Sequence, residues 1–210
     1  MKLFQYWDTG DPPDDVAGWI ESFRHLNPEM THRLYDRDSA SWFIGKHLGQ
    51  RHRRAFDACA VPAMQADYFR ACALWAKGGA WADADCAPQR PLGELFKGVS
   101  HALITAWEDY FPLDLMMFRQ ADDPLLGAWL KRITKNVEDR VPGNVSMVTG
   151  PDAFQLVVEA AEPGSPAHTS LSRVTPLDWS RAGPWRGLPQ GRYKDGPRHW
   201  LNWKGSIYRD

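Results

Sequence analysis

The sequence predicts a single α/β domain with one mostly parallel sheet flanked by helices. Apolar runs at strand spacing alternate with runs whose apolar residues recur every three or four positions. One helical run ends in two glycines and leads directly into a further strand. The chain has 210 residues, 43% of them hydrophobic and 24% charged, which is typical of one globular domain.

The first sixty residues are expected to form strand, helix and strand, followed by two more helices. Leu3 to Trp7 is the first expected strand, and a loop rich in glycine and proline follows it. Asp36-Arg37-Asp38 is expected to cap a helix, because it follows a strand-like run and precedes a helical one. The remaining elements expected here are the helix 14–26, the strand 30–35, and the helices 39–48 and 51–60.

The stretch 62–86 is the one around which the chain is organised. Pro62 suits a first helical position, and apolar residues at helical spacing continue to Trp75. Gly78-Gly79 should stop that helix, because glycine tolerates backbone conformations that other residues resist. A strand over 80–85 should follow, with Trp81, Asp83 and Asp85 on one face and alanines on the other.

Two carboxylates on one face of a strand end favour a hard divalent cation with oxygen ligands. On the preceding helix, Asp67 and Arg70 lie three positions apart and therefore share a face. The bare Asp-x-Asp pattern is weakly specific, since the copy at 36–38 is better explained as a helix cap. The wider context of Asp83 and Asp85 is what favours a binding site.

The second half of the chain is expected to add strands, helices and an irregular tail. Gly150-Pro151 opens a helix whose N-terminus is expected either to face the site, where phosphate or sugar hydroxyls would bind, or only to start the helix. The expected elements are a short helix 92–96, strands 101–107 and 114–118, a helix 123–140, a strand 169–174 and an irregular loop or lid over 176–197. These boundaries divide one domain, 1–210, into a nucleotide-binding half (1–86), an acceptor-side half (87–175) and a lid-like tail (176–210).

The ordered string Asp67, Arg70, Gly78-Gly79, Trp81, Asp83 and Asp85 resembles the signature of the glycosyltransferases with a DXD sugar-binding region. That family includes fungal initiating α-1,6-mannosyltransferases and bacterial capsular relatives, and the catalytic domains of large clostridial glucosylating toxins carry a similar string. The resemblance implies an A-type glycosyltransferase fold, a UDP- or GDP-linked sugar donor, a Mn²⁺ or Mg²⁺ cofactor and retention at the anomeric carbon. It also implies a saccharide or other hydroxyl acceptor, as in bacterial surface polysaccharide synthesis.

The same resemblance implies roles for individual residues. Asp85 would ligate the metal directly, and Asp83 would hold the ribose and contact the metal. Asp67 and Arg70 would bind the donor sugar, with Trp81 in the same donor-binding set. In the family, the first strand ends in a tryptophan at the nucleotide base, which corresponds to Trp7 here. A core tryptophan is the alternative for that position.

The tail carries a weaker part of the resemblance. Family members end in a histidine followed by Gly-Ser-Trp, which closes the site. Here His199 and Gly205-Ser206 are present, but Ile207 stands in place of the tryptophan. The resemblance implies His199 as a metal ligand or diphosphate contact and Ser206 as a further oxygen near the metal. A tail packed permanently in place, with His199 bonded locally, is the alternative.

Composition narrows the other possibilities. A net charge of −1 gives no electrostatic reason to expect nucleic acid or an anionic membrane as partner. Three cysteines without metal spacing, and no membrane span or signal peptide, indicate a cytoplasmic protein; peripheral membrane association and the oligomeric state stay open. Eleven tryptophans are expected to be mostly core, with two or three at a ligand. The alternative functions are a metal-dependent nucleotide-sugar phosphohydrolase and a non-catalytic sugar-binding protein of the same fold.

Overall fold

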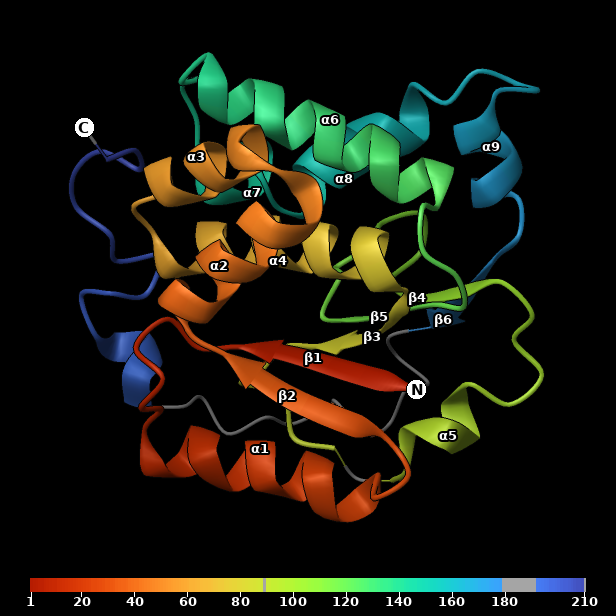
Figure 1. Cartoon of the computed structure of the whole chain (residues 1–210), viewed down its shortest axis with the longest axis horizontal. Helices are drawn as coiled ribbons and strands as arrows, with labels where there is room; N and C mark the ends of the chain where they lie inside the picture. The colour runs from red at the N-terminus through yellow and green to blue at the C-terminus, as the bar shows by residue number, and fades with distance from the viewer. Residues whose placement is uncertain (89, 179–191, 210) are drawn as a thin grey trace.

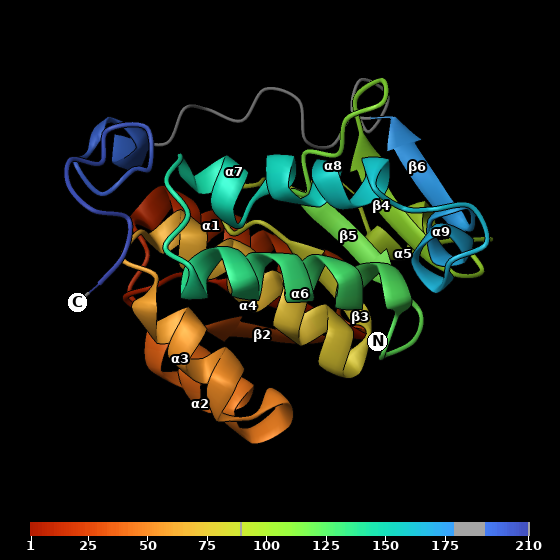
Figure 2. The same cartoon turned by 90° about the horizontal axis from the view of Figure 1, so that it is seen from above.

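The computed structural model describes residues 1–88, 90–178 and 192–209. Figure 1 shows a central sheet with α1 and α5 on one side and the larger group of helices, including α2, α4 and α6, on the other. Figure 2, seen from above, shows α7 and α8 in one row with α6 beside them. The arrangement is therefore the expected α/β fold, with helices on both faces of one sheet.

The first half follows the sequence-based expectation closely. Asp36 caps its helix as expected, since its side chain accepts the Ser39 N–H at 2.8 Å while Ser39 Oγ accepts the Asp36 N–H. Gly78 and Gly79 have φ of 58° and 104°, and a Cβ on Gly79 would lie 2.8 Å from the Lys2 carbonyl oxygen, so glycine is required at this break. The elements are β1 (Lys2–Tyr6), α1 (Asp14–Leu26), β2 (Thr31–Tyr35), α2 (Arg37–Leu48), α3 (Gln50–Ala58), α4 (Pro62–Lys77) and β3 (Gly79–Ala82).

The second half contains every expected helix and two α-helices that were not expected, α7 and α9. α7 is a single turn whose N-cap Asn144 accepts the Met147 N–H at 2.9 Å. The elements are α5 (Leu92–Leu95), β4 (Ala102–Ala106), β5 (Leu115–Phe118), α6 (Pro124–Glu138), α7 (Val145–Val148), α8 (Pro151–Glu159), α9 (Pro166–Leu171), β6 (Val174–Asp178) and a 3₁₀ turn η1 (Arg192–Asp195).

The structure differs from two of the expected strands. The strand expected over 80–85 ends at Ala82, because the chain turns there and the Cys86 N–H bonds the Asp83 carbonyl. The strand expected over 169–174 is replaced by α9, whose N-cap Ser165 accepts the His168 N–H and is followed by Pro166. β6 begins only at Val174, so 176–178 is strand rather than loop. Residues 179–191 of the expected lid lie outside the described residues, and its end contains the 3₁₀ turn η1.

The sheet has the order β2-β1-β3-β5-β4-β6. Its pairs β1–β2, β1–β3 and β4–β6 are parallel, whereas β5 runs antiparallel to both β3 and β4. The carboxyl ends of β1 and β3 therefore lie at the same edge as the start of β5. Ligands of open α/β sheets bind beyond the carboxyl ends of the strands, and this edge is where the candidate site lies.

Helix α4 is buried along most of its length between the sheet and α6. Its residues from Met64 to Leu74 are buried with few exceptions, and its charged pair Asp67 and Arg70 is only 7% and 3% exposed. Trp81 and Trp129 are fully buried core residues, so part of the large tryptophan content fills the interior, as expected. A charged pair held inside the molecule needs partners there, and the site supplies them.

The end of the chain is fixed to the turn between α3 and α4. The Ala60 N–H donates to the Ile207 carbonyl at 2.9 Å, and the Arg209 N–H donates to the Ala58 carbonyl at 2.8 Å. The Tyr208 hydroxyl also donates to the Val141 carbonyl at 2.6 Å. These bonds match the alternative of a packed tail for 207–209, whereas residues 196–200 lie over the site.

Candidate active site

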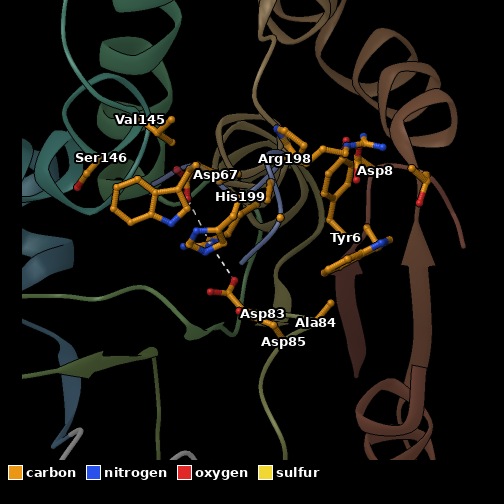
Figure 3. Close-up of a pocket in the computed structure, with 18 of the residues that line it drawn as sticks. Tyr6, Asp8, Asp67, Asp83, Ala84, Asp85, Val145, Ser146, Arg198 and His199 are labelled. Atoms are coloured by element: carbon orange, nitrogen blue, oxygen red, sulfur yellow. Dashed lines mark hydrogen bonds and ion pairs between the residues drawn. The ribbon is translucent and has the colours of Figure 1, made fainter. Parts of the chain in front are cut away.

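A cavity of about 840 Å³ opens at the sheet edge where β1 and β3 end. Figure 3 shows Asp67, Asp83, Asp85 and His199 near its middle, with Tyr6 and Asp8 on one wall and Val145 and Ser146 on the other. The residues come from the ends of β1 and β3, from α4, from the connection between β4 and β5, from α7 and α8, and from the tail.

The floor of the cavity is a chain of charged and polar contacts. Arg70 Nη2 lies 2.6 Å from Asp83 Oδ1 and 3.5 Å from Asp67 Oδ1. The Trp81 indole N–H donates to the same Asp83 oxygen at 2.7 Å, and the Arg70 guanidinium lies 5.0 Å from the centre of the Trp81 ring. One planar guanidinium therefore joins two carboxylates and an aromatic face, an arrangement that an ammonium group could not reproduce.

The local sequence explains why these groups meet. Asp67 and Arg70 share a face of α4 because they are three residues apart. Trp81 and Asp83 are two residues apart, so both point to the same side as β3 ends. The predicted grouping of Asp67, Arg70, Trp81 and Asp83 is thus present in the structure.

Burial raises the pKa values of the Asp67 and Asp83 carboxyl groups on this floor, because it disfavours their charged form. Desolvation raises the pKa of Asp67 to about 6, while the nearby Arg70 and the Thr149 hydroxyl oppose the rise. Desolvation also raises the pKa of Asp83 to about 7; Arg70 opposes this rise, and the negative charges of Asp85 and Asp114 add to it. A bound cation or a set of hydroxyl donors would stabilise these anions.

Asp85 faces a cationic part of the tail. Its Oδ2 lies 3.2 Å from Lys194 Nζ, and its side chain is 26% exposed. His199 lines the same cavity, and its pKa is lowered by burial and by Lys194, with Asp85 acting in the opposite direction. His199 and Asp85 therefore line the same cavity.

The donor chemistry at Asp83 and Asp85 fits a divalent cation with oxygen ligands. Within residues 1–88, 90–178 and 192–209, no three His, Cys, Asp or Glu side chains are grouped so as to hold a metal by themselves. Mg²⁺ is commonly bound by one or two carboxylates together with the phosphates of a substrate. Asp83 and Asp85 could therefore hold such an ion together with a diphosphate.

One end of the cavity is formed by the residues that follow β1. Trp7 lines the cavity and is half-buried, which allows a stacking role as well as a packing role. Asp8 also lines it and is ion-paired with Arg198 of the tail. Burial raises the pKa of Asp8, and Arg198 counteracts that rise.

The opposite wall contains residues that no sequence pattern predicts as part of a site. Tyr110, from the connection between β4 and β5, donates its hydroxyl to Asp152 Oδ1 at 2.8 Å. The Ser146 hydroxyl accepts the Asp152 N–H at 3.2 Å, which joins α7 to α8 at the cavity rim. The positions of these residues depend on contacts between segments that are distant in the sequence. Asp8 and Arg198 are the missed residues that the sequence could have indicated, because Asp8 follows Trp7 and Arg198 precedes His199.

Ser206 is the predicted site residue that does not line the cavity. It is exposed; its hydroxyl accepts the Tyr208 N–H at 3.1 Å, and its carbonyl accepts the Trp203 indole N–H at 3.1 Å. Ser206 therefore organises the fixed end of the tail. The other predicted residues, Trp7, Asp67, Arg70, Trp81, Asp83, Asp85 and His199, all line the cavity.

Comparison with known proteins agrees with this geometry. Residues 13–104 match the family model described as the glycosyltransferase sugar-binding region containing a DXD motif. Residues 13–104 are thus similar to a glycosyltransferase sugar-binding region. This region holds Asp67, Arg70, Asp83 and Asp85, so the resemblance found in the sequence is confirmed. The initiation-specific alpha-1,6-mannosyltransferase of Schizosaccharomyces pombe is 27% identical over 92 residues, covering 41% of this chain and 23% of that protein.

The chain thus spans less than a quarter of the curated relative that it matches. Among solved structures, the PaToxG glycosyltransferase has a TM-score of 0.57 at 14% identity, covering 98% of this chain and 84% of that one. The UDP-bound glycosyltransferase domain of the YGT toxin has a TM-score of 0.56 at 9% identity, covering 84% and 79%. Both comparisons show that this chain shares its fold with these glycosyltransferase domains. No helix among the described residues is long and apolar enough to cross a membrane.

Proposed function

We propose that this chain is a metal-dependent retaining glycosyltransferase that moves a hexose from a nucleotide-diphosphate sugar to a hydroxyl acceptor. The observation that carries the proposal is the Asp67–Arg70–Asp83 chain on the cavity floor, with Asp85 beside it and Trp7 at one end. The cavity volume of about 840 Å³ is sufficient for a ligand of nucleotide-sugar size.

Each group has a role that follows from its environment. Asp67 and Arg70, buried and aimed into the cavity, would accept from and donate to the hydroxyls of the donor sugar. Asp83 would hold the ribose, and Trp7 would stack on the base. The UDP-bound neighbour supports a uridine nucleotide as the first donor to test, with GDP-linked sugars as the alternative.

The transfer breaks the bond between the anomeric carbon and a phosphate oxygen and forms a bond from the acceptor oxygen to that carbon. The acceptor's proton passes to the departing phosphate oxygen, so no protein nucleophile is required. Asp83 and Asp85 would hold Mn²⁺ or Mg²⁺, and His199 would add a metal or diphosphate contact. When bound, the ion stabilises the negative charge that develops on the diphosphate.

Turnover of nucleotide sugars with and without an acceptor tests the proposal. We would incubate the protein and Mn²⁺ with UDP-glucose, UDP-galactose or GDP-mannose and measure the released nucleoside diphosphate and the glycosylated product. Release that depends on a saccharide acceptor would support transfer. Equal release without acceptor would favour the phosphohydrolase, and ligand-induced thermal stabilisation without any release would favour the sugar-binding protein.

The acceptor and the cellular setting are the broadest part of the proposal. A saccharide acceptor in bacterial surface polysaccharide synthesis follows from the resemblance to capsular relatives. Cys59, Cys72 and Cys86 are free and buried, which supports a reducing compartment such as the cytoplasm. Product analysis with oligosaccharide acceptors would test the proposed acceptor. Fractionation of the producing cells would test the proposed compartment.

A further inference from the structure

The segment Thr149-Gly150-Pro151 leads into α8 and reaches the cavity from the side opposite the sheet. We propose that Gly150 and Thr149 are positioning residues that hold the Asp67 carboxylate against Arg70. They would thereby set how tightly the site holds the donor's sugar, with little effect on its nucleotide. The proposal rests on the proposed function, in which Asp67 binds the sugar.

Gly150 is in unusually close contact with Asp67. A Cβ built on Gly150 would lie 2.8 Å from Asp67 Oδ2 and 3.0 Å from Ser146 Cα. Atoms at such distances repel strongly, and neither neighbour moves easily: Ser146 offers backbone, and Asp67 lies on the buried helix α4. A side chain at Gly150 would therefore displace the carboxylate or separate α8 from α4.

The backbone itself does not require glycine at this position. Gly150 has a negative φ of −89°, so its φ does not require glycine. The close approach of Asp67 and Ser146 is what excludes a side chain. Gly150→Ala therefore tests these close contacts.

Thr149 contributes the second contact. It is fully buried, and its hydroxyl lies 3.4 Å from Asp67 Oδ2 and 3.3 Å from the Val145 carbonyl oxygen. The bond to Asp67 is long, so the close approach at Gly150 contributes more to the positioning. Arg70 holds the other carboxylate oxygen at 3.5 Å and is itself fixed by Asp83 at 2.6 Å.

The carboxylate of Asp67 is thus enclosed between α8 and Arg70, with one edge toward the cavity. A hydroxyl bound by this carboxylate depends on its position to within a fraction of an ångström, and a misplacement of about 1 Å can cost about 100-fold in rate. The proposed nucleotide contacts are Trp7, at one end of the cavity, and Asp83, on its floor, and neither belongs to α8.

The first experiment compares affinities for a donor and for its parent nucleotide. The probe is whichever of UDP-glucose, UDP-galactose and GDP-mannose stabilises the wild type most with Mn²⁺, paired with UDP or GDP. Gly150→Ala should weaken binding of the nucleotide sugar by roughly 10-fold or more while leaving the free nucleotide within about 2-fold. Thr149→Val should weaken sugar binding less, and Thr149→Ser should restore it. Gly18→Ala, where an added Cβ meets nothing within 4 Å, is the matched control and should leave both affinities unchanged.

A second experiment needs no ligand. Urea unfolding of wild type, Gly150→Ala, Asp67→Ala and the double variant forms a mutant cycle. The midpoint loss caused by Gly150→Ala should be smaller when residue 67 lacks its carboxylate, with the close approach to Ser146 Cα accounting for the loss that is left. Additive midpoint losses, or unchanged sugar affinity in Gly150→Ala, would overturn the positioning role. The proposed function fails if no nucleotide sugar binds the wild type, or if Asp67→Asn turns over the donor normally. In either case the mutant cycle still decides whether Gly150 positions Asp67.

Discussion

Replacing Asp67 with asparagine should change how the stability of the protein depends on pH. Burial raises the pKa of Asp67 from 3.8 to about 6, and the residue is 7% exposed. The folded state therefore holds this proton more tightly than the unfolded chain does. As pH rises from about 4 to about 6 the unfolded state loses its proton first, so the stability supplied by the protonated carboxyl is lost across that window.

The size of the effect follows from the change in pKa. A change from 3.8 to about 6 corresponds to about 3 kcal/mol, using about 1.4 kcal/mol for each pKa unit. Asp67→Asn has no carboxyl to titrate, so its stability relative to the wild type should rise by about this amount between pH 4 and pH 7. In a domain of this size that corresponds to a relative change of roughly 6 to 12 °C in melting temperature.

Urea unfolding without metal or nucleotide, at several pH values from 4 to 7, measures this difference directly. Comparing the two proteins at each pH cancels the constant cost of replacing the side chain. Asp38→Asn is the control, because Asp38 is exposed and its variant should follow the wild-type curve closely. Parallel curves for Asp67→Asn and the wild type would refute the conclusion that burial governs this carboxyl.

Three further results are expected at the site. Asp85→Asn should lower transfer by roughly 1000-fold or more with the fold intact, as measured by turnover and thermal melting, because the cation would lose its main carboxylate; near-normal turnover would reject that assignment. Arg70→Lys should not restore what Arg70→Ala loses, because an ammonium cannot span Asp67 and Asp83 while facing Trp81; full activity in Arg70→Lys would contradict this. Lys194→Met should tighten Mn²⁺ binding about 3- to 5-fold in a calorimetric titration, since Lys194 Nζ, 3.2 Å from Asp85, competes for that carboxylate at a strength of about 1 kcal/mol; unchanged affinity would show that the pair does not form in solution.

The sequence predicted the part of the site that depends on short spacings. Asp67 and Arg70 follow from a helix with three-residue spacing, and Asp83 follows from strand alternation two residues after Trp81. Asp85 lies in the cavity although the strand stops at Ala82, because the turn continues along the same edge of the sheet. The order of strands and helices up to α6 was predictable for the same reason, since each of these elements carries its own periodicity and end signals.

The features of the site and the fold that the sequence did not predict depend on contacts between segments that are distant in the sequence. Lys194 reaches Asp85 across more than a hundred residues, and nothing near either residue signals the pairing. The place of Ser206 in a motif predicts a site role, but Ser206 bonds to Tyr208 because the end of the chain is fixed to the α3–α4 turn. Threonine and valine favour a strand over 169–174, but the cap at Ser165 outweighs that preference and α9 forms instead.

The reversed direction of β5 has a consequence for how new specificities arise on this scaffold. Because β4 ends and β5 begins at the same edge, the whole connection between them lies beside the cavity. This connection contributes Tyr110 and Pro112 to the wall, and its Trp107 is 63% exposed. Its exposed residues 107–109 can change without altering the register of any strand or the Asp67–Arg70–Asp83 floor, whereas Leu113 is fully buried in the core. In the proposed function, substitutions in this connection would therefore vary the acceptor while the proposed donor-binding groups stay in place.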